Sequence, residues 1–296
     1  MSSLVRKLFV TGEFFTIGIR KKRIPGILND LRFVPEYILP ATGQKWAADP
    51  MLVDFEGKTF LFYEAVVGDK GHIEVAKVRD DCTLEEPVTS LKDECHYSYP
   101  FVFRHDAQWY MIPESSAASE VRLYRAVSFP DKWELQDVLL REKTVDTTVF
   151  VEKGQMYLLT FFLVPGCERV IPHAYKMELE KGKARLEEIP WEAYDTLQVR
   201  GAGPVFRWEE GVYRPAQISQ EQRYGDGIAF CRVNAGDTYK EKQIVRMTAK
   251  ELKISGYYAD GLHTYCASES FEAIDIRCGT VELNKSIKRL GRLLRK

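Results

Sequence analysis

Residues 46–64 read WAADPMLVDFEGKTFLFYE, and this stretch decides the fold. Two runs rich in apolar and aromatic residues flank a turn at Glu56-Gly57, which is the pattern of a β-hairpin. A carboxylate stands near each open end, at Asp49 and at Glu64. The stretch therefore predicts two antiparallel strands with an acidic residue on each strand, away from the turn.

The same unit returns along the chain with a period close to fifty residues. Residues 99–114 read YPFVFRHDAQWYMIPE and residues 146–161 read DTTVFVEKGQMYLLTF, so each unit ends fifteen positions after it begins. A fourth unit begins at about Gly203 with a turn at Glu210-Gly211, and a fifth start fits residues 261–265. Strand pairs repeated at this interval are typical of a β-propeller with one repeat per blade. We therefore predict an all-β, five-bladed β-propeller; a β-sandwich or barrel with unrelated hairpins is the alternative.

The two ends of the chain differ from the repeats. Residues 14–19, FFTIGI, are expected to close the ring by pairing with the last blade, because an unclosed blade leaves an exposed edge. Residues 283–296 place leucine and isoleucine at helical spacing between six basic residues, which is typical of a short basic amphipathic helix. The predicted organisation is a single propeller over residues 1–282 and a basic amphipathic tail over residues 283–296.

Composition limits the partners and the compartment. The chain holds 42 basic and 43 acidic residues, and six of the basic ones lie in the tail, so the body is acidic and nucleic acid is not expected as a partner. Six scattered cysteines lack metal-ligand spacing. The N-terminus lacks the apolar core of a signal peptide, and no apolar run is long enough to span a bilayer. We expect a cytoplasmic protein with reduced thiols.

The basic tail suggests peripheral attachment to the inner face of a membrane. Its contacts with an anionic surface would come from Lys285, Lys288, Arg289 and Arg292. A frayed tail, or a helix docked on the acidic body, is an equally open interpretation, because Gly291 weakens a helix and the segment is short.

Propeller geometry gathers the candidate site residues. The innermost strand of each blade lines the axis, so residues that begin these strands meet at one mouth, and residues that end the second strands return to it. The residues expected around this mouth are Asp49, Glu64, Tyr99, Glu114, Asp146, Arg200, Arg214, Gln217 and His263. Clustered carboxylates suit chemistry at an anomeric carbon, where one accepts a proton and another donates one. Tyr97 and Tyr99 suit the apolar face of a sugar. The carboxylates could instead cap turns or tie neighbouring blades together.

Several motifs resemble a known family. They are Ala48-Asp49-Pro50, Phe62-Tyr63-Glu64, residues 98–103 (SYPFVF), 111–115 (MIPES), 121–126 (VRLYRA), 129–133 (FPDKW) and 261–265 (GLHTY). Together they resemble the five-bladed propeller domain of plant glucosamine inositolphosphorylceramide transferase and its bacterial relatives, which occur with cell-surface polysaccharide genes. The resemblance covers about residues 13–276. It implies glycosyl transfer from a sugar-nucleotide donor to a carbohydrate or glycolipid acceptor, in capsule, lipopolysaccharide or glycolipid assembly, without a further cofactor.

More distantly, the chain is similar to the propellers of arabinanase and levansucrase-type glycosidases. By this resemblance Asp49 matches their base and Asp146 their supporting aspartate. Residues 200–203 (RGAG) stand where their acid glutamate is expected. That departure favours transfer over simple hydrolysis, because a phosphate leaving group needs less acid help.

These expectations combine into one hypothesis with two alternatives. In a glycosyltransferase, Asp49 would be the base, Asp146 and Glu114 would orient the acceptor, and Arg200 and Arg214 would hold the donor phosphates. The other predicted substrate-binding residues are Glu64, Tyr99, Gln217 and His263. No metal ligands are assigned, and the need for a metal stays open. The alternatives are a glycoside hydrolase whose acid is Glu64 or Glu114, and a non-catalytic propeller that binds glycan or protein.

Overall fold

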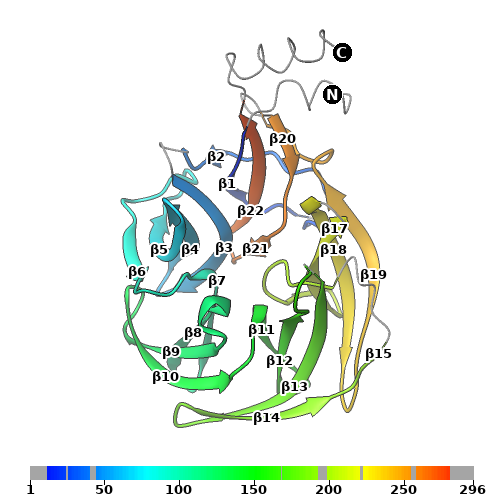
Figure 1. Cartoon of the computed structure of the whole chain (residues 1–296). Coiled ribbons are helices and arrows are strands. Elements are labelled where there is room, and N and C mark those ends of the chain that lie inside the picture. Colours follow the sequence, from blue (N-terminus) through cyan, green and yellow to red (C-terminus); the bar gives the residue numbers. More distant parts are fainter. Residues whose placement is uncertain are drawn as a thin grey trace, which may run out of the picture.

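The computed structural model describes residues 12–24, 26–40, 45–167, 169–192, 199–220, 223–254 and 258–280. These residues form five sheets arranged around a central axis (Figure 1). The prediction of an all-β, five-bladed propeller is therefore confirmed. The predicted amphipathic tail lies outside the described residues. Within the described ranges, no helix has the length and apolar character needed to cross a bilayer.

The first three blades have four antiparallel strands each. Blade one contains β3 (Lys45–Phe55), β4 (Lys58–Val67), β5 (Lys70–Val78) and β6 (Val88–Leu91). Blade two contains β7 (Ser98–His105), β8 (Gln108–Glu114), β9 (Val121–Ser128) and β10 (Lys132–Leu140), with the short helix η1 (Ser116–Ala118) after β8. Blade three contains β11 (Thr144–Glu152), β12 (Gln155–Leu163), β13 (Val170–Glu180) and β14 (Lys183–Ile189).

The last two blades depart from this pattern. Blade four contains β16 (Phe206–Trp208), β17 (Gly211–Gln220), β18 (Arg223–Ala235) and β19 (Tyr239–Thr248), and β15 (Trp191–Glu192) runs parallel to β19. Blade five contains β1 (Gly12–Lys21), β2 (Tyr37–Ile38), β20 (Tyr258–Gly261), β21 (Tyr265–Ala267) and β22 (Phe271–Thr280). Blade five is thus built from both ends of the described chain.

Strand β1 closes the ring, as residues 14–19 predicted. It pairs with β22 along its whole length, from Gly12 opposite Thr280 to Lys21 opposite Phe271 (Figure 1). A buried ion pair joins the same two strands, because Arg20 Nε donates to Glu272 Oε2 at 2.8 Å. The closing strand therefore extends beyond residue 19, to Lys21.

The inner hairpins have two-residue turns, as the Glu56-Gly57 pair predicted. At Glu56-Gly57, Asp106-Ala107 and Lys153-Gly154 both turn residues have φ between 47° and 82°. This conformation matches the twist of the flanking strands and keeps a hairpin tight. The apolar core lies between the blades, where Phe62 of blade one packs with Met111 of blade two.

The inner strands of blades one to three share an irregularity near their first residues. The pairing register shifts between Ala48 and Met51, between Ser98 and Phe101, and between Val145 and Thr148. The residue inside each bulge, Asp49, Tyr99 or Asp146, has φ between 42° and 52°. Left-handed φ is uncommon outside glycine and a bulge redirects the side chain it carries. The same type of β-bulge therefore places all three predicted residues.

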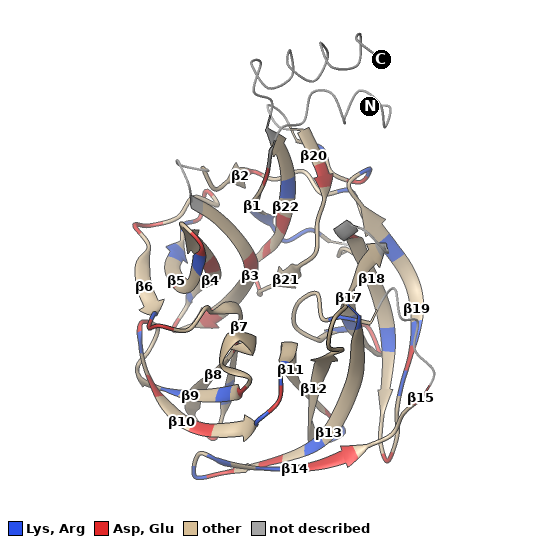
Figure 2. Cartoon of the chain, in the orientation of Figure 1, with Lys and Arg blue, Asp and Glu red and all other residues tan. Residues whose placement is uncertain are grey.

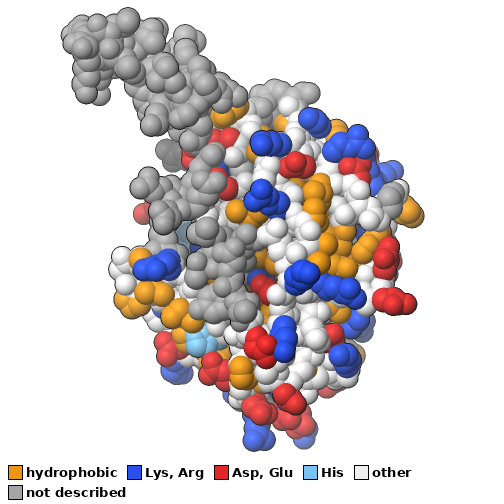
Figure 3. Space-filling view, turned by 90° about the vertical axis from the view of Figure 1, so that its right-hand side faces the viewer, with side chains coloured by type: hydrophobic (Ala, Val, Ile, Leu, Met, Phe, Trp, Pro, Cys, Tyr) orange, Lys and Arg blue, Asp and Glu red, His pale blue; other side chains and the backbone are white. Residues whose placement is uncertain are grey.

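Acidic and basic residues are interspersed over the molecule. Figure 2 shows acidic and basic residues on the outer strand β14 and also on β22, in the middle of blade five. The face drawn in Figure 3 carries basic and acidic side chains interspersed around apolar ones. That face has no broad surface of one sign of the kind that binds nucleic acid.

Candidate functional site

Asp49 holds three blades together at the axis. Its Oδ1 accepts a hydrogen bond from the Thr264 hydroxyl at 2.8 Å and lies 3.2 Å from His263 Nε2. Its Oδ2 accepts the backbone N–H of Tyr99 at 3.2 Å, and its own N–H donates to Asp275 Oδ2 at 3.2 Å. The carboxylate thus ties blade one to blades two and five.

His263 is a buried cation between two carboxylates. Its Nδ1 lies 2.8 Å from Asp275 Oδ2, its Nε2 faces Asp49, and its side chain is 3% exposed. Burial opposes a charged ring, but the carboxylates of Asp275 and Asp49 raise the pKa of His263 to about 10. Burial also works against ionised Asp49, yet His263 and the hydrogen-bond donors keep the pKa of Asp49 below its usual value. Both groups are therefore charged at neutral pH.

The ligand atoms of Asp49, His263 and Asp275 lie within 4.8 Å of one another, which is close enough to consider a metal site. Metal ligation requires a neutral imidazole nitrogen. Here each ring nitrogen faces a carboxylate oxygen, as expected for an imidazolium ion. The geometry therefore favours an ion-paired triad over a metal centre.

Tyr99 links blades two, three and four. Its hydroxyl accepts the backbone N–H of Gly203 at 2.9 Å and lies 3.1 Å from the hydroxyl of Thr148. Tyr97 and Tyr99 are 0% and 1% exposed, so neither ring has a free face. The expectation that these rings stack on a sugar is therefore not met.

Glycines let the backbone of blade four approach Asp146, Tyr99 and Tyr265 closely. A Cβ at Gly203, where φ is +123°, would lie 1.9 Å from the carbonyl oxygen of Tyr265. A Cβ at Gly201 would lie 2.8 Å from Cβ of Asp146 and 3.1 Å from the Tyr99 hydroxyl. Residues 200–203 are therefore glycine-rich because backbone packs against neighbouring blades there.

Asp146 forms a two-point ion pair with Arg200. The guanidinium Nε lies 2.7 Å from Oδ2, and Nη2 lies 3.1 Å from Oδ1. Burial raises the pKa of Asp146, and the Arg200 charge opposes that rise. Such a fork-shaped pair is directional, so it fixes the Arg200 side chain as well as joining blades three and four.

Glu114 stands beside this pair and is held more loosely. Its Oε1 accepts a hydrogen bond from the Ser116 hydroxyl at 2.9 Å, and its Oε2 lies 4.0 Å from Arg200 Nη2. Burial, then the charge of Asp146, raises the pKa of Glu114 to about 7, although Arg200 acts in the other direction. With a side chain that is 15% exposed, Glu114 can exchange a proton with a ligand near neutral pH.

Glu64 pairs with His96, a residue that the sequence analysis missed. His96 Nε2 lies 3.0 Å from Glu64 Oε1, and the Gly71 backbone N–H donates to His96 Nδ1 at 2.9 Å. Glu64 raises the pKa of His96, but the N–H at Nδ1 favours the neutral ring with its proton on Nε2. Burial raises the pKa of Glu64, and the bond from His96 opposes that rise.

Two predicted residues lie behind the site. Arg214 is buried, with Nε and Nη2 bonded to Glu241 at 2.7 and 2.5 Å and Nη1 bonded to the carbonyls of Val199 and Arg200. Gln217 is also buried, and its backbone N–H donates to the Arg200 carbonyl at 2.9 Å. Both residues support the backbone that carries Arg200. Direct phosphate binding by Arg214 is not favoured by this geometry.

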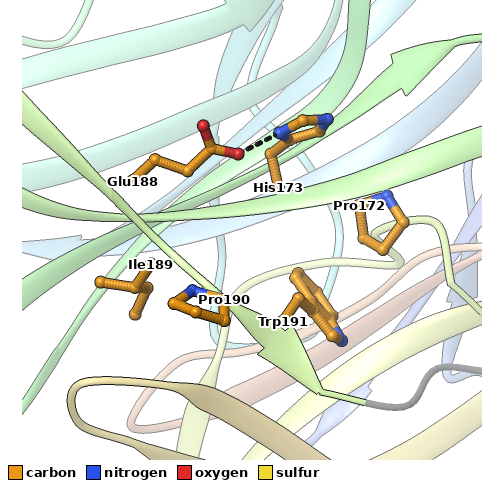
Figure 4. Close-up of a pocket in the computed structure, with 6 residues that line it drawn as sticks. All are labelled: Pro172, His173, Glu188, Ile189, Pro190 and Trp191. Carbon is orange, nitrogen blue, oxygen red and sulfur yellow. Dashed lines mark hydrogen bonds and ion pairs between the residues drawn. The ribbon is translucent and has the colours of Figure 1, made fainter.

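Two cavities lie away from the axial cluster. One of about 350 Å³ is on blade three, where His173 Nδ1 lies 2.6 Å from Glu188 Oε1 beside Trp191 (Figure 4). Another of about 380 Å³ lies near the hairpin turns of blades three and four and includes Lys153 and Arg207. Neither is lined by any residue that the sequence placed at the site.

The fold and site define a five-bladed propeller with charged side chains gathered where its inner strands begin. Residues 40–263 match the family described as "Glucosamine inositolphosphorylceramide transferase 1, N-terminal". The match covers most of the chain, so this protein belongs to that family, as the sequence motifs indicated.

Curated relatives and solved structures agree with this placement. Glucosamine inositolphosphorylceramide transferase 1 of Oryza sativa subsp. indica is 32% identical over 221 residues, covering 70% of this chain and 27% of that protein. The protein of the same name from Arabidopsis thaliana is 29% identical over 206 residues, covering 67% and 27%. The chain thus spans about a quarter of these relatives. A family 117 glycoside hydrolase of Zobellia galactanivorans superposes with a TM-score of 0.53 at 15% identity, covering 92% of this chain and 91% of that one, which shows the fold.

Proposed function

We propose that this propeller takes part in glycosyl transfer from a sugar nucleotide to a carbohydrate or glycolipid acceptor bound at the axial mouth. The observation that carries the proposal is Glu114, a carboxyl with a pKa of about 7, beside the Arg200–Asp146 ion pair. The curated relatives named above, whose name refers to a glycolipid transferase, support the general class.

In this proposal Glu114 is the general base. As the acceptor hydroxyl attacks the anomeric carbon, Glu114 takes its proton, and the bond to the donor phosphate breaks with its electron pair on the leaving oxygen. Positive charge that develops on the sugar ring is stabilised by the fixed negative charges of the axial cluster. Arg200, whose Nη2 lies 4.0 Å from Glu114 Oε2, would supply positive charge to the donor phosphate.

The proposed base differs from the aspartate that the sequence suggested. Both oxygens of Asp49 accept hydrogen bonds, and the pKa of Asp49 is lowered, so it is a poor proton acceptor. Glu114 has one oxygen on Ser116 and the other at 4.0 Å from Arg200. The geometry therefore favours Glu114 as base and Asp49 as a fixed charge.

The test is turnover of nucleotide sugars by the purified full chain. UDP-glucose, UDP-N-acetylglucosamine, UDP-glucuronic acid and GDP-mannose are incubated with and without a glycolipid extract, and release of nucleoside diphosphate is measured. We expect one donor to turn over and Glu114→Gln to lose about 10²-fold or more of that rate while the variant stays folded. Glu56→Gln, in an exposed turn, is the matched control. Equal rates in the two variants would refute Glu114 as base.

A non-catalytic glycan-binding propeller is the second candidate. It is favoured by the engagement of Asp49 and Asp146 in bonds between blades, which leaves fewer groups for chemistry. Carbohydrate binding by calorimetry without turnover of any nucleotide sugar would support this function. Release of reducing sugar without a nucleotide would instead indicate a hydrolase.

We also propose a cytoplasmic location at the inner membrane surface, with contacts from Lys285, Lys288, Arg289 and Arg292. The support is the basic, amphipathic pattern of residues 283–296. The full chain is expected to sediment with vesicles that contain anionic phosphatidylglycerol but not with neutral phosphatidylcholine vesicles. Replacing the four basic residues by glutamate abolishes this sedimentation, and sedimentation that survives the replacement contradicts the assignment.

A further inference from the structure

A sugar-binding mouth needs an apolar surface as well as carboxylates, because a sugar ring presents C–H groups on its faces. The buried rings of Tyr97 and Tyr99 cannot supply it. Trp46 is 37% exposed, whereas the other aromatic side chains whose exposure the structure describes are buried or half-buried.

Trp46 is connected to the axial cluster through one aromatic contact. It lies on β3, three residues before Asp49, and meets Phe15 edge-on with ring centroids 6.0 Å apart. Phe15 in turn meets the His263 ring at 4.6 Å. The indole is therefore held from one side by packed rings that reach the buried His263–Asp49 pair.

Trp46 is also close to a carboxylate that has an unused oxygen. In the β3–β4 ladder Trp46 pairs with Val66, and Ala48 pairs with Glu64. Trp46 and Glu64 are thus diagonal neighbours, and such positions lie about 7–8 Å apart. Glu64 Oε1 bonds to His96, whereas Oε2 makes no hydrogen bond or ion pair with any described residue. The small side chain of Ala48 separates the two groups.

We propose that Trp46 is the sugar-stacking platform of the axial mouth. Its exposed face packs against the C–H face of a pyranose ring, and Glu64 Oε2 accepts a hydrogen bond from a hydroxyl of the same ring. His96 holds the other oxygen and so fixes the direction of the carboxylate. The assignment rests on the proposed function, because it presumes a carbohydrate ligand at this mouth.

The experiment is isothermal calorimetry on the full chain with methyl glycosides of glucose, glucosamine, N-acetylglucosamine and mannose, and with cellobiose and chitobiose. For the sugar that binds wild type, we expect Trp46→Ala to weaken affinity at least tenfold and Trp46→Phe to weaken it less than threefold. Leu135→Ala removes a 51% exposed side chain from the outer strand β10 and is expected to change nothing. Binding also shifts the tryptophan fluorescence of wild type, and this shift is lost in Trp46→Phe.

The outcomes separate the two levels of the proposal. Wild type that binds a sugar with Trp46→Ala binding it equally well overturns the platform and leaves the proposed function standing. Wild type that binds none of the sugars and turns over no nucleotide sugar overturns the proposed function, and the platform with it. Trp46→Phe keeps an aromatic ring and is expected to fold. If Trp46→Ala alone fails to fold, the loss of the fluorescence shift in Trp46→Phe still tests the platform.

Discussion

The acidic residues that begin the inner strands and those that end the second strands have different environments. Asp49 and Asp146 lie in bulges with left-handed φ, and donors from neighbouring blades engage their oxygens. Glu64 and Glu114 each have one oxygen held by a single side chain. A carboxylate near the propeller axis can therefore act on a ligand only when the protein leaves one of its oxygens available.

The same difference sets the charge of each group. His263 and the hydrogen-bond donors lower the pKa of Asp49 despite its burial, whereas burial with few donors raises the pKa of Glu114 to about 7. Asp49, paired with His263, and Asp146, paired with Arg200, form an inner circle of structural ion pairs. Glu64 and Glu114 form a second circle, one strand farther out, where burial raises both pKa values and brings that of Glu114 to about 7.

Gly203→Ala is expected to have the largest effect on the inner circle. Its Cβ would lie 1.9 Å from a backbone oxygen, so blade four must move away from blade five. We expect a loss of about 4 kcal/mol in the free energy of unfolding, measured with guanidinium chloride. Gly154→Ala is the control, because φ there is +82° but no atom lies within 4 Å. Gly154→Ala introduces the strain of alanine at positive φ without a steric clash, and it is expected to lower the free energy of unfolding by about 1 kcal/mol. Equal losses in the two variants would show that close packing of the blades does not stabilise the circle.

Asp49→Asn is expected to have the next largest effect. It leaves the buried His263 cation with Asp275 alone, and removing one partner of a buried pair costs about 3 kcal/mol. The pKa of His263 is raised from 6.5 to about 10, so the wild type has this stabilisation in full below pH 6.5 and loses it as pH rises towards 10. In Asp49→Asn that slope shrinks. Unfolding at pH 6 and pH 9 measures it, and an unchanged slope would show that His263 is not held as a cation by Asp49.

Local signals predicted the fold well. Turn chemistry at Glu56-Gly57 marked the first inner hairpin, and the repeat of similar hairpins along the chain implied blades. Propeller geometry then brought Asp49 and His263 together although they are 214 positions apart in the chain. Whether such residues serve structure or chemistry was not predictable, because it depends on which donors neighbouring blades supply.

The residues that the sequence missed or misassigned show the same limit. His96 meets Glu64 only because a backbone N–H of Gly71, in another strand, fixes the ring. Arg214 and Arg200 are both arginines near blade four, yet one faces Glu241 in the interior and the other faces Asp146 at the axis. The partner that each arginine meets is set by tertiary packing and not by the local sequence pattern.

Glu114→Gln is expected to have a smaller effect on stability, with a sign opposite to that of the Asp49 variant. A carboxyl whose pKa is raised from 4.5 to about 7 binds more protons in the folded state, so wild type loses stability as pH rises between these values. Glutamine cannot ionise and removes this loss, so Glu114→Gln is expected to be more stable than wild type at pH 7.5. Unfolding of both proteins at pH 4.5 and pH 7.5 measures the difference, with Glu56→Gln as control. Parallel pH profiles for wild type and Glu114→Gln would remove the reason for choosing Glu114 as base.

His96→Ala is expected to have the smallest effect on stability. It tests whether His96 adjusts the pKa of Glu64 without being needed for the fold. The bond from His96 lowers the pKa of Glu64 against the rise caused by burial, so its loss should raise that pKa further. Carboxyl chemical shifts of Glu64 report the titration directly. His96→Gln retains an N–H donor and is expected to restore part of the shift, while His105→Ala, at a histidine bonded to the Leu179 carbonyl, should leave Glu64 unchanged. If His96→Ala instead destabilises the protein as much as Gly203→Ala is expected to, the Glu64–His96 pair belongs to the inner circle and the distinction between the two circles fails.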